Sequence, residues 1–202
     1  MKTVKRLRPL LFAAALLSVC STQAAPQSPT IRTGVANVSV GTSTVINQST
    51  PTLAIDWASF DVSATESVRF NQPSVSSVAL NRVTSGSPSS IFGRIDANGK
   101  IILVNSAGIL FGKTAQVNTG AFVASSMEFD ETTLGADRLR FSGPGAKIEN
   151  AGALNGQEFV AVVAPSIDNS GTVRGGSVAL AAGAEVIIST ASGLFDVQVP
   201  VG

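Results

Sequence analysis

One stretch of the chain, residues 81–125, limits the possible folds more than any other. It alternates short apolar runs, such as 101–104 and 109–111, with glycine and asparagine. Runs of this length are too short for helices and are typical of strands. Asn98-Gly99 and Ala107-Gly108 can supply the positive φ values that tight turns need. The stretch therefore predicts short β-strands that stack on one another and are joined by tight turns.

A repeat with an offset of 19 residues supports the same architecture. Residues 148–154, IENAGAL, recur as 167–173, IDNSGTV, and the same offset aligns Phe159 with Val178 and Val160 with Ala179. One copy cannot enclose a core, so the repeat is read as one coil of a solenoid, and its strand content favours a parallel β-helix. The residues expected to face the core are Ile148, Leu154, Phe159, Ile167, Val173 and Val178. Equivalent asparagines, Asn150 and Asn169, predict either a ladder of side-chain amides or a capped turn.

The first 24 residues have the order of a secretory signal peptide. Basic residues at positions 2, 5, 6 and 8 precede an apolar run, 10–19, and small residues follow. We expect cleavage between Ala24 and Ala25. The apolar run falls short of the roughly 20 residues of a membrane-spanning helix. A lipoprotein signal ending at Cys20 is the alternative, although Val19 is bulky where such signals have a small residue.

The composition beyond residue 24 excludes several functional classes. The chain has no His and no Tyr, and its one Cys lies in the predicted signal peptide, which excludes Ser-His-Asp and Cys-His catalysis and ordinary zinc sites. We expect no metal and no cofactor. Ten basic residues against 13 acidic ones form no basic patch, so no nucleic-acid partner is expected.

Four segments are expected along the chain. Residues 25–30, with two prolines, predict a flexible leader. Residues 31–75 predict an amino-terminal β cap, and residues 76–202 predict the β-helix. A charged segment near 127–142 is expected to leave the regular stack, either as a short helical turn or as two edge strands and a loop. The carboxy-terminal coil is expected to associate with another chain or to continue, since an open coil invites aggregation.

Several phrases of the sequence carry a family resemblance over roughly residues 46–183. They are Ala54-Ile55-Asp56-Trp57, Asn71-Gln72-Pro73-Ser74, Val78–Val83, Ile91-Phe92-Gly93, Ile109–Gly112 and Ala115–Asn118. Together they resemble the amino-terminal secretion domain of filamentous haemagglutinin-type exoproteins, the passengers of bacterial two-partner secretion (TPS).

The resemblance implies a fold, a route and a partner. The expected fold is all-β, a right-handed parallel β-helix with an amino-terminal cap. The protein would be exported through the inner membrane and then secreted or displayed on the cell surface. Its expected partner is an outer-membrane TpsB-type transporter, an Omp85-like pore with periplasmic binding modules, and this pore would provide its only membrane contact. A host or neighbouring cell surface is a further candidate partner, and no enzymatic role is implied.

The family's Asn-Pro-Asn-Gly turn is altered in this chain. It reads Asn105-Ser106-Ala107-Gly108, and Gly108 should still allow the turn to form with weaker preorganisation. Exposed turns and free strand edges are expected to dock the partner by β-augmentation. The candidates are Asn81, Arg82, Val83, Asn105, Ser106, Ala107 and Gly108. The alternative is that Asn and Gly stand there to make the turn.

Two other functions remain open from the sequence. One is a small stand-alone β-helical adhesin that acts through its own surface. The other is a polysaccharide-active β-helix enzyme, with Asp130, Glu131 and Asp137 near Arg138 and Arg140, although a solvated charged loop is favoured for these residues. Trp57 is expected to be buried under the cap, so an exposed aromatic platform for sugars is not apparent.

Overall fold

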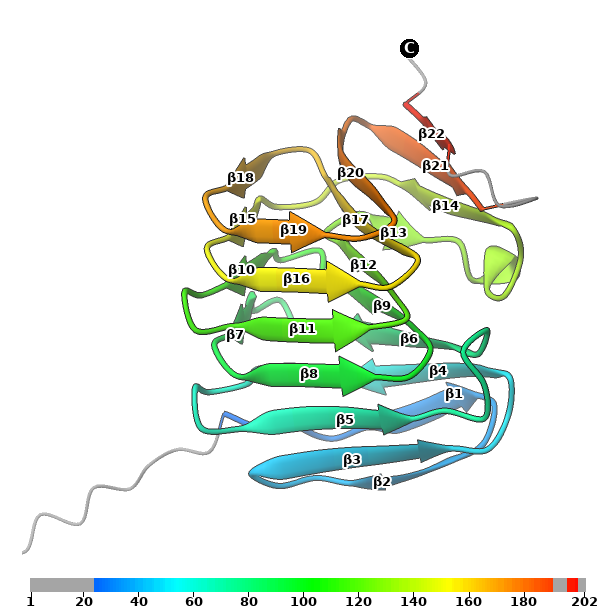
Figure 1. Ribbon diagram of the computed structural model, residues 1–202, viewed down its shortest axis with the longest axis vertical. Coiled ribbons are helices and arrows are strands. Elements are labelled where there is room, and N and C mark those ends of the chain that lie inside the picture. Colours follow the sequence, from blue (N-terminus) through cyan, green and yellow to red (C-terminus); the bar gives the residue numbers. More distant parts are fainter. Residues whose placement is uncertain (1–23, 191–195, 200–202) are drawn as a thin grey trace, which may run out of the picture.

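Three sheets form the walls of a right-handed parallel β-helix in the computed structural model, which describes residues 24–190 and 196–199 (Figure 1). The first wall contains β2 (Ala36–Ser39), β3 (Ser43–Gln48), β5 (Ser67–Asn71), β8 (Arg94–Ala97), β11 (Gln116–Thr119), β16 (Ala153–Gly156) and β19 (Thr172–Arg174). The second contains β1 (Thr30–Thr33), β4 (Thr52–Trp57), β6 (Val78–Val83), β9 (Lys100–Val104), β12 (Ala121–Ser125), β17 (Phe159–Ala164) and β20 (Ser177–Ala182). The third contains β7 (Ser89–Ile91), β10 (Ile109–Phe111), β15 (Ile148–Asn150) and β18 (Ile167–Asn169).

The chain visits the walls in the order first, second, third, and then begins the next coil. Parallel pairing in register stacks equivalent residues, as in the row Val68, Ile95, Val117 and Leu154 of the first wall. Side chains alternate between the two faces of each strand, so these rows point inward and fill one continuous core. Each fully buried side chain of this size contributes about 1.5–3 kcal/mol. The predicted all-β right-handed parallel β-helix with an amino-terminal β cap is confirmed.

A fourth sheet, here named the side sheet, covers the outer face of the second wall. It is antiparallel and contains β13 (Glu128–Phe129), β14 (Arg138–Ser142), β21 (Glu185–Ser189) and β22 (Asp196–Gln198). Every residue of strands β12 and β17 is buried, because the core covers one face of these strands and the side sheet covers the other. A second apolar cluster fills this interface, where Phe129 and Phe141 have ring centroids 5.2 Å apart.

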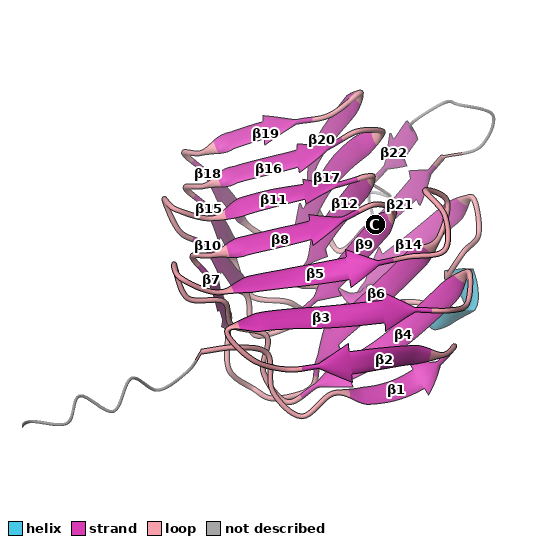
Figure 2. Ribbon diagram, turned by 60° about the horizontal axis from the view of Figure 1, so that its bottom comes forward, coloured by secondary structure: helices cyan, strands magenta, loops and turns pink. Residues whose placement is uncertain are grey.

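The segment expected to leave the stack is an insertion in the fourth coil, between β12 and β15. Both forms considered for it are present, since a single 3₁₀ turn, η1 (Glu131–Thr133), lies between β13 and β14. Figure 2 shows η1 on the outside of the molecule. The insertion is held in place by β21, a strand much later in the chain. β14 pairs with β21 from Arg138↔Ser189 to Ser142↔Glu185.

The cap and the leader differ from their expected limits. Parallel stacking already begins at β3, which pairs with β5, so only the antiparallel strands β1 and β2 lie outside the coils at this end. The expected leader 25–30 is bound to the body: Ala25 is buried, and Gln27 exchanges backbone hydrogen bonds with Ala58 and Ser59 at 3.0 and 2.9 Å. At the other end, β21 and β22 belong to the side sheet and not to a coil.

The 19-residue repeat holds in the first and third walls and fails in the second wall. It pairs Ile148 with Ile167 and Ala153 with Thr172, but Val160 pairs with Val178, an offset of 18. Three residues separate Asn155 from β17, whereas two separate Arg174 from β20, and a one-residue slip reverses the faces of a strand. The prediction that Phe159 faces the core is therefore wrong, because Phe159 packs in the second cluster under the side sheet.

The predicted signal peptide and the alternative lipoprotein signal at Cys20 both concern the first 24 residues. The predicted signal peptide, Cys20 included, lies outside the described residues apart from Ala24. Among the residues that the structure describes, no helix has the length and apolar character needed to cross a bilayer.

Candidate functional site

The first predicted recognition segment, Asn81–Val83, lies in the middle of the second wall and not at an edge. Its strand, β6, is paired with β4 on one side and β9 on the other. Asn81 and Val83 are buried, and the Asn81 side-chain oxygen accepts a hydrogen bond of 3.0 Å from Nε1 of Trp57. Trp57 is fully buried, as predicted. These two recognition candidates thus serve the interior.

Arg82 points to the opposite face and joins four elements. Its guanidinium pairs with Asp56 of β4, at 3.7 Å, and with Glu131 of η1. Asp56 in turn pairs with Arg32 of β1 at 3.6 Å. The Arg82 side chain retains 23% exposure, and its Nε has no hydrogen-bond partner. The arrangement ties β1 and η1 to β4 and β6.

The second predicted segment, Asn105–Gly108, forms the turn between β9 and β10. The Gly108 N–H donates to the Asn105 carbonyl at 2.9 Å, and Gly108 has a φ of 104°, so the expected turn is present without its proline. The Asn105 side chain is buried, accepts from the Ala107 N–H at 3.0 Å and donates to Ser87 and Ser89, both at 3.0 Å. Ser106 is the exposed residue of this segment, Ala107 is half-buried, and Asn105 and Gly108 are buried.

The predicted asparagine pair performs both of the roles considered for it. Asn150 donates through its amide to Asn169 at 2.8 Å, which is one rung of a ladder between coils. Its oxygen also accepts from the Gly152 N–H at 3.1 Å, which caps the turn.

The carboxylates proposed for an enzyme have separate partners. Asp130 caps η1 through Thr132, and these hydrogen bonds, first from the hydroxyl and then from the backbone, hold the pKa of Asp130 below its usual value. Glu131 pairs with Arg82, and Arg140 pairs with Glu185 at 2.9 Å. Asp137 and Arg138 are exposed. Within residues 24–190 and 196–199, no group of three potential metal-ligating side chains comes together.

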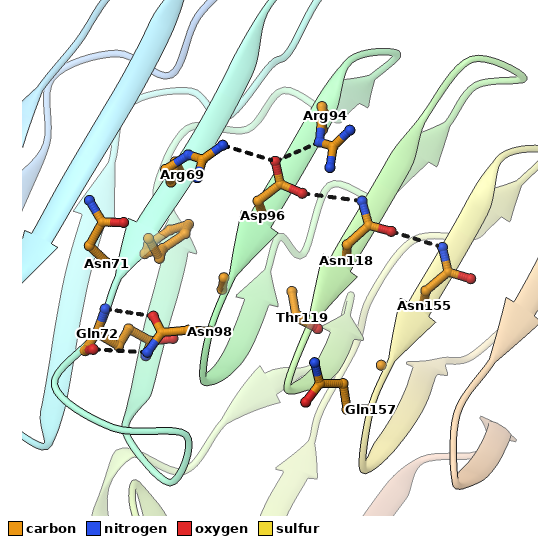
Figure 3. A pocket seen from close by; sticks show the side chains of 13 residues that line it. Arg69, Asn71, Gln72, Arg94, Asp96, Asn98, Asn118, Thr119, Asn155 and Gln157 are labelled. Atoms are coloured by element: carbon orange, nitrogen blue, oxygen red, sulfur yellow. Dashed lines mark hydrogen bonds and ion pairs between the residues drawn. The ribbon is translucent and has the colours of Figure 1, made fainter.

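A polar groove of about 760 Å³ crosses the outer face of the first wall and was not predicted. Figure 3 shows its central row, in which Asn155 donates to Asn118 at 3.1 Å and Asn118 donates to Asp96 at 3.2 Å. Arg94 Nε donates to the other Asp96 oxygen at 2.6 Å, and Arg69 lies 3.9 Å from the same oxygen. The hydrogen bond with Asp96, followed by the attraction of its charge, raises the pKa of Arg94 above its ordinary value.

The groove could not be predicted from the sequence, because its residues do not recur at a constant spacing. Asp96, Asn118 and Asn155 are separated by 22 and 37 residues, since the side-sheet insertion falls between the last two. Only the register of β8, β11 and β16 brings them into one row. A sequence signal existed only in the alternation of polar residues with Ile95, Val117 and Leu154.

Comparisons with known proteins point to one family. The model of the family described as the TPS secretion domain matches residues 21–198. A heme/hemopexin-binding protein of Haemophilus influenzae strain Rd is 42% identical over 106 residues, which are 52% of this chain and 12% of that protein. A second Haemophilus influenzae heme/hemopexin-binding protein is 33% identical over 97 residues, 48% of this chain and 10% of that protein. The chain thus spans about a tenth of the length of these curated relatives.

A solved structure shares the fold over most of the chain. The crystal structure of the HMW1 secretion domain from Haemophilus influenzae has a TM-score of 0.77 and 29% sequence identity. The likeness covers 88% of this chain and 49% of that one. The capped parallel β-helix and the match over residues 21–198 together show that this chain belongs to the TPS secretion domain family, whose members direct exoproteins to a partner transporter in two-partner secretion.

Proposed function

We propose that the periplasmic modules of an outer-membrane TpsB-type transporter recognise this domain and that the pore moves the exoprotein to the cell surface or the medium. The family match over residues 21–198 carries this proposal, because it extends over most of the chain and not over one motif. The domain acts as an address for the transporter and has no catalytic role. Cleavage after Ala24 would release the signal peptide before the encounter.

The free edge of β2 is the docking site that the geometry favours. Residues 34–55 carry no charged side chain, so the edge lacks the charges that usually prevent strand addition. Val35 and Val40 flank β2 and are exposed. The other edge strand at this end, β1, is bulged between Ile31 and Thr33, which makes it a poorer template.

The backbone of β2 offers free donors along this edge. The Val35 carbonyl accepts a hydrogen bond from the Ser49 N–H at 2.8 Å, so the backbone groups of Val35 face the β3 side. Backbone groups of an antiparallel strand alternate in direction, and the N–H groups of Ala36 and Val38 therefore point away from β3. A strand from a transporter module could pair with them by β-augmentation.

Among the residues first considered for recognition, the accessible ones remain secondary candidates. Arg82, Ser106 and Ala107 retain exposed surface, whereas Asn81, Val83, Asn105 and Gly108 are buried. A transporter module that contacted the 105–108 turn would meet mainly Ser106.

A binding measurement with the purified domain and the transporter's periplasmic modules tests the docking edge. Ala36→Pro removes one N–H that faces solvent and leaves the bonds to β3 intact, which an edge strand tolerates. We expect loss of binding with unchanged Trp57 emission. Asn37→Ala, which keeps every backbone donor, should bind like the parent chain. Equal binding of all three proteins would contradict docking at β2 but not secretion by the transporter.

The names of the curated relatives raise heme or hemopexin as a ligand of such exoproteins. Heme iron in proteins is held mainly by His, Cys, Met or Tyr. The chain has no His or Tyr, its one Cys precedes the predicted cleavage site, and Met127 is fully buried. We therefore assign any heme contact of the exoprotein to residues outside this domain.

A further inference from the structure

We propose that the groove of the first wall binds an acidic polysaccharide, a sugar polymer bearing carboxylate or sulfate groups, through Arg69, Arg94 and the amides of Asn118 and Asn155. This site goes beyond secretion and would let the exported domain hold a polyanionic glycan. The oxygens of carboxylate and sulfate groups are acceptors, so both groups can be bound by the same Arg and Asn donors.

The charge of this face is opposite to that of the rest of the domain. Residues 25–202 hold ten basic and 13 acidic side chains, a net charge of about −3. The charged residues on the outward rows of the first wall are Arg69, Arg94, Arg174 and Asp96, since Arg174 pairs in register with Asn155. This face is therefore positive, and an anionic ligand would be drawn to it.

The hydrogen-bond ladder leaves the groove rich in donors. Asn118 occupies one oxygen of Asp96, Arg94 occupies the other, and Asn155 occupies the oxygen of Asn118. Each amide nitrogen has a second N–H, and each guanidinium has further N–H groups. The side chains of Arg69 and Arg94 are 61% and 55% exposed, whereas Asp96 is 17% exposed. A ligand over Arg69, Arg94 and Asn118 thus meets donors and needs acceptor oxygens, whereas Asn155 at the end of the row presents both its second N–H and its oxygen.

The shape and edges of the groove favour a polysaccharide over a peptide. The groove is open and runs across β5, β8, β11 and β16, and its exposed lining is made largely of Arg, Asn and Gln side chains (Figure 3). Peptides that bind sheets add a strand to a free edge. Here β5, β8, β11 and β16 are paired on both sides, so no edge is available. Sugar hydroxyl, ring and acidic oxygens match the free donors without needing an apolar pocket.

Titration of the purified chain with four polymers tests this site. Polygalacturonate presents carboxylates, heparin presents sulfates, dextran is neutral and polyglutamate is an acidic peptide. We expect binding of polygalacturonate or heparin, which identifies the acidic group, and none of dextran. Arg94→Gln should weaken binding about tenfold, because charge-assisted hydrogen bonds are lost. Asn155→Leu, which leaves the charge unchanged, should also weaken it.

The matched control is Arg138→Gln, an equal change of charge on the side sheet, and it should leave binding unchanged. Equal weakening by Arg94→Gln and Arg138→Gln would overturn the site, as would polyglutamate binding as tightly as the sugars. Failure of all four polymers to bind would overturn it too. Secretion of Arg94→Gln should be normal, so this test is independent of the docking edge of β2.

Discussion

At the scale of single residues, buried amides hold the coils together. Asn81 is the partner of Trp57 Nε1, and both groups are removed from water. Asn81→Ala should reduce the free energy of unfolding by about 1–3 kcal/mol, because it leaves a buried donor unpaired. Urea unfolding followed by emission of Trp57, the only tryptophan, measures this. Asn71→Ala removes an exposed amide bond to Asn47 and should change stability by less than about 0.5 kcal/mol. Similar losses for both variants would contradict the assignment.

A buried hydroxyl without a partner predicts the opposite effect. Thr119 is 4% exposed, and its Oγ1 has no hydrogen-bond partner. Thr119→Val keeps the shape and removes the unsatisfied group, so we expect a gain of about 1 kcal/mol in the free energy of unfolding. A loss of stability would show that the hydroxyl has a partner in solution. The same urea titration gives the answer.

Asp61 should make stability depend on pH. Burial raises its pKa, the Ser90 N–H lowers it, and the charge of Glu66 raises it, with a net rise above 3.8. The folded state therefore binds this proton more tightly, so the ionised group destabilises the fold at neutral pH and the penalty fades as pH falls through the folded pKa. Asp61→Asn keeps an acceptor for Ser90 and should unfold at higher urea at pH 7. Near pH 3, about where Asp is protonated, the difference should vanish; a difference that persists there would contradict this origin.

At the scale of elements, the turn between β9 and β10 is the best test of local preorganisation. Asn105 occupies the first position and Gly108 the fourth, where positive φ is found. Ser106 occupies the second position, for which Pro has the right φ. Ser106→Pro should raise the free energy of unfolding by about 0.4–1 kcal/mol, because the unfolded chain loses freedom. A destabilisation measured by thermal unfolding would mean that the backbone at 106 differs from this turn.

The strands and turns could be predicted from the sequence, whereas the elements that pack against them could not. Glycine turns and apolar runs in residues 81–125 specify β9, β10 and β12 locally. The unbroken apolar runs of β12 and β17 indicate that both faces are covered, yet nothing local identifies the cover. It is supplied by β14 and β21, which lie some 45 residues apart in the chain. The burial of Asn81 and Asn105 was missed for the same reason, because polar side chains at turns and strands look exposed until the neighbouring coil is placed.

At the scale of the whole molecule, the contribution of a core side chain to the free energy of unfolding depends on where its coil lies in the stack. Ile148 and Ile167 are equivalent, but Ile148 is buried between coils, whereas Ile167 lies in β18, the last strand of the third wall, and is only partly covered. Ile148→Ala should cost about 2–5 kcal/mol. Ile167→Ala should cost about 1 kcal/mol or less, because its cavity already opens to solvent. Equal shifts of the urea midpoint would show that the end of the third wall is covered in solution.

The last coil also exposes apolar side chains at its end of the stack. Val178 and Leu180 of β20 are each 46% exposed, and Val178 sits in the row that faces the core elsewhere. Such an end favours further pairing, so association or a following coil remains our prediction for it. Light scattering at rising protein concentration should detect self-association, which Leu180→Lys should reduce. Scattering that stays constant for the parent chain would contradict association in solution and leave a following coil as the remaining form of the prediction.

The central claim is that this domain directs secretion through a partner pore. The most direct measurement compares the chain in culture medium and periplasm of a bacterium with and without a TpsB-type transporter. The account predicts release into the medium only when the transporter is present, with an Ala36→Pro variant retained in the periplasm. Equal retention of the parent chain with and without the transporter would contradict it.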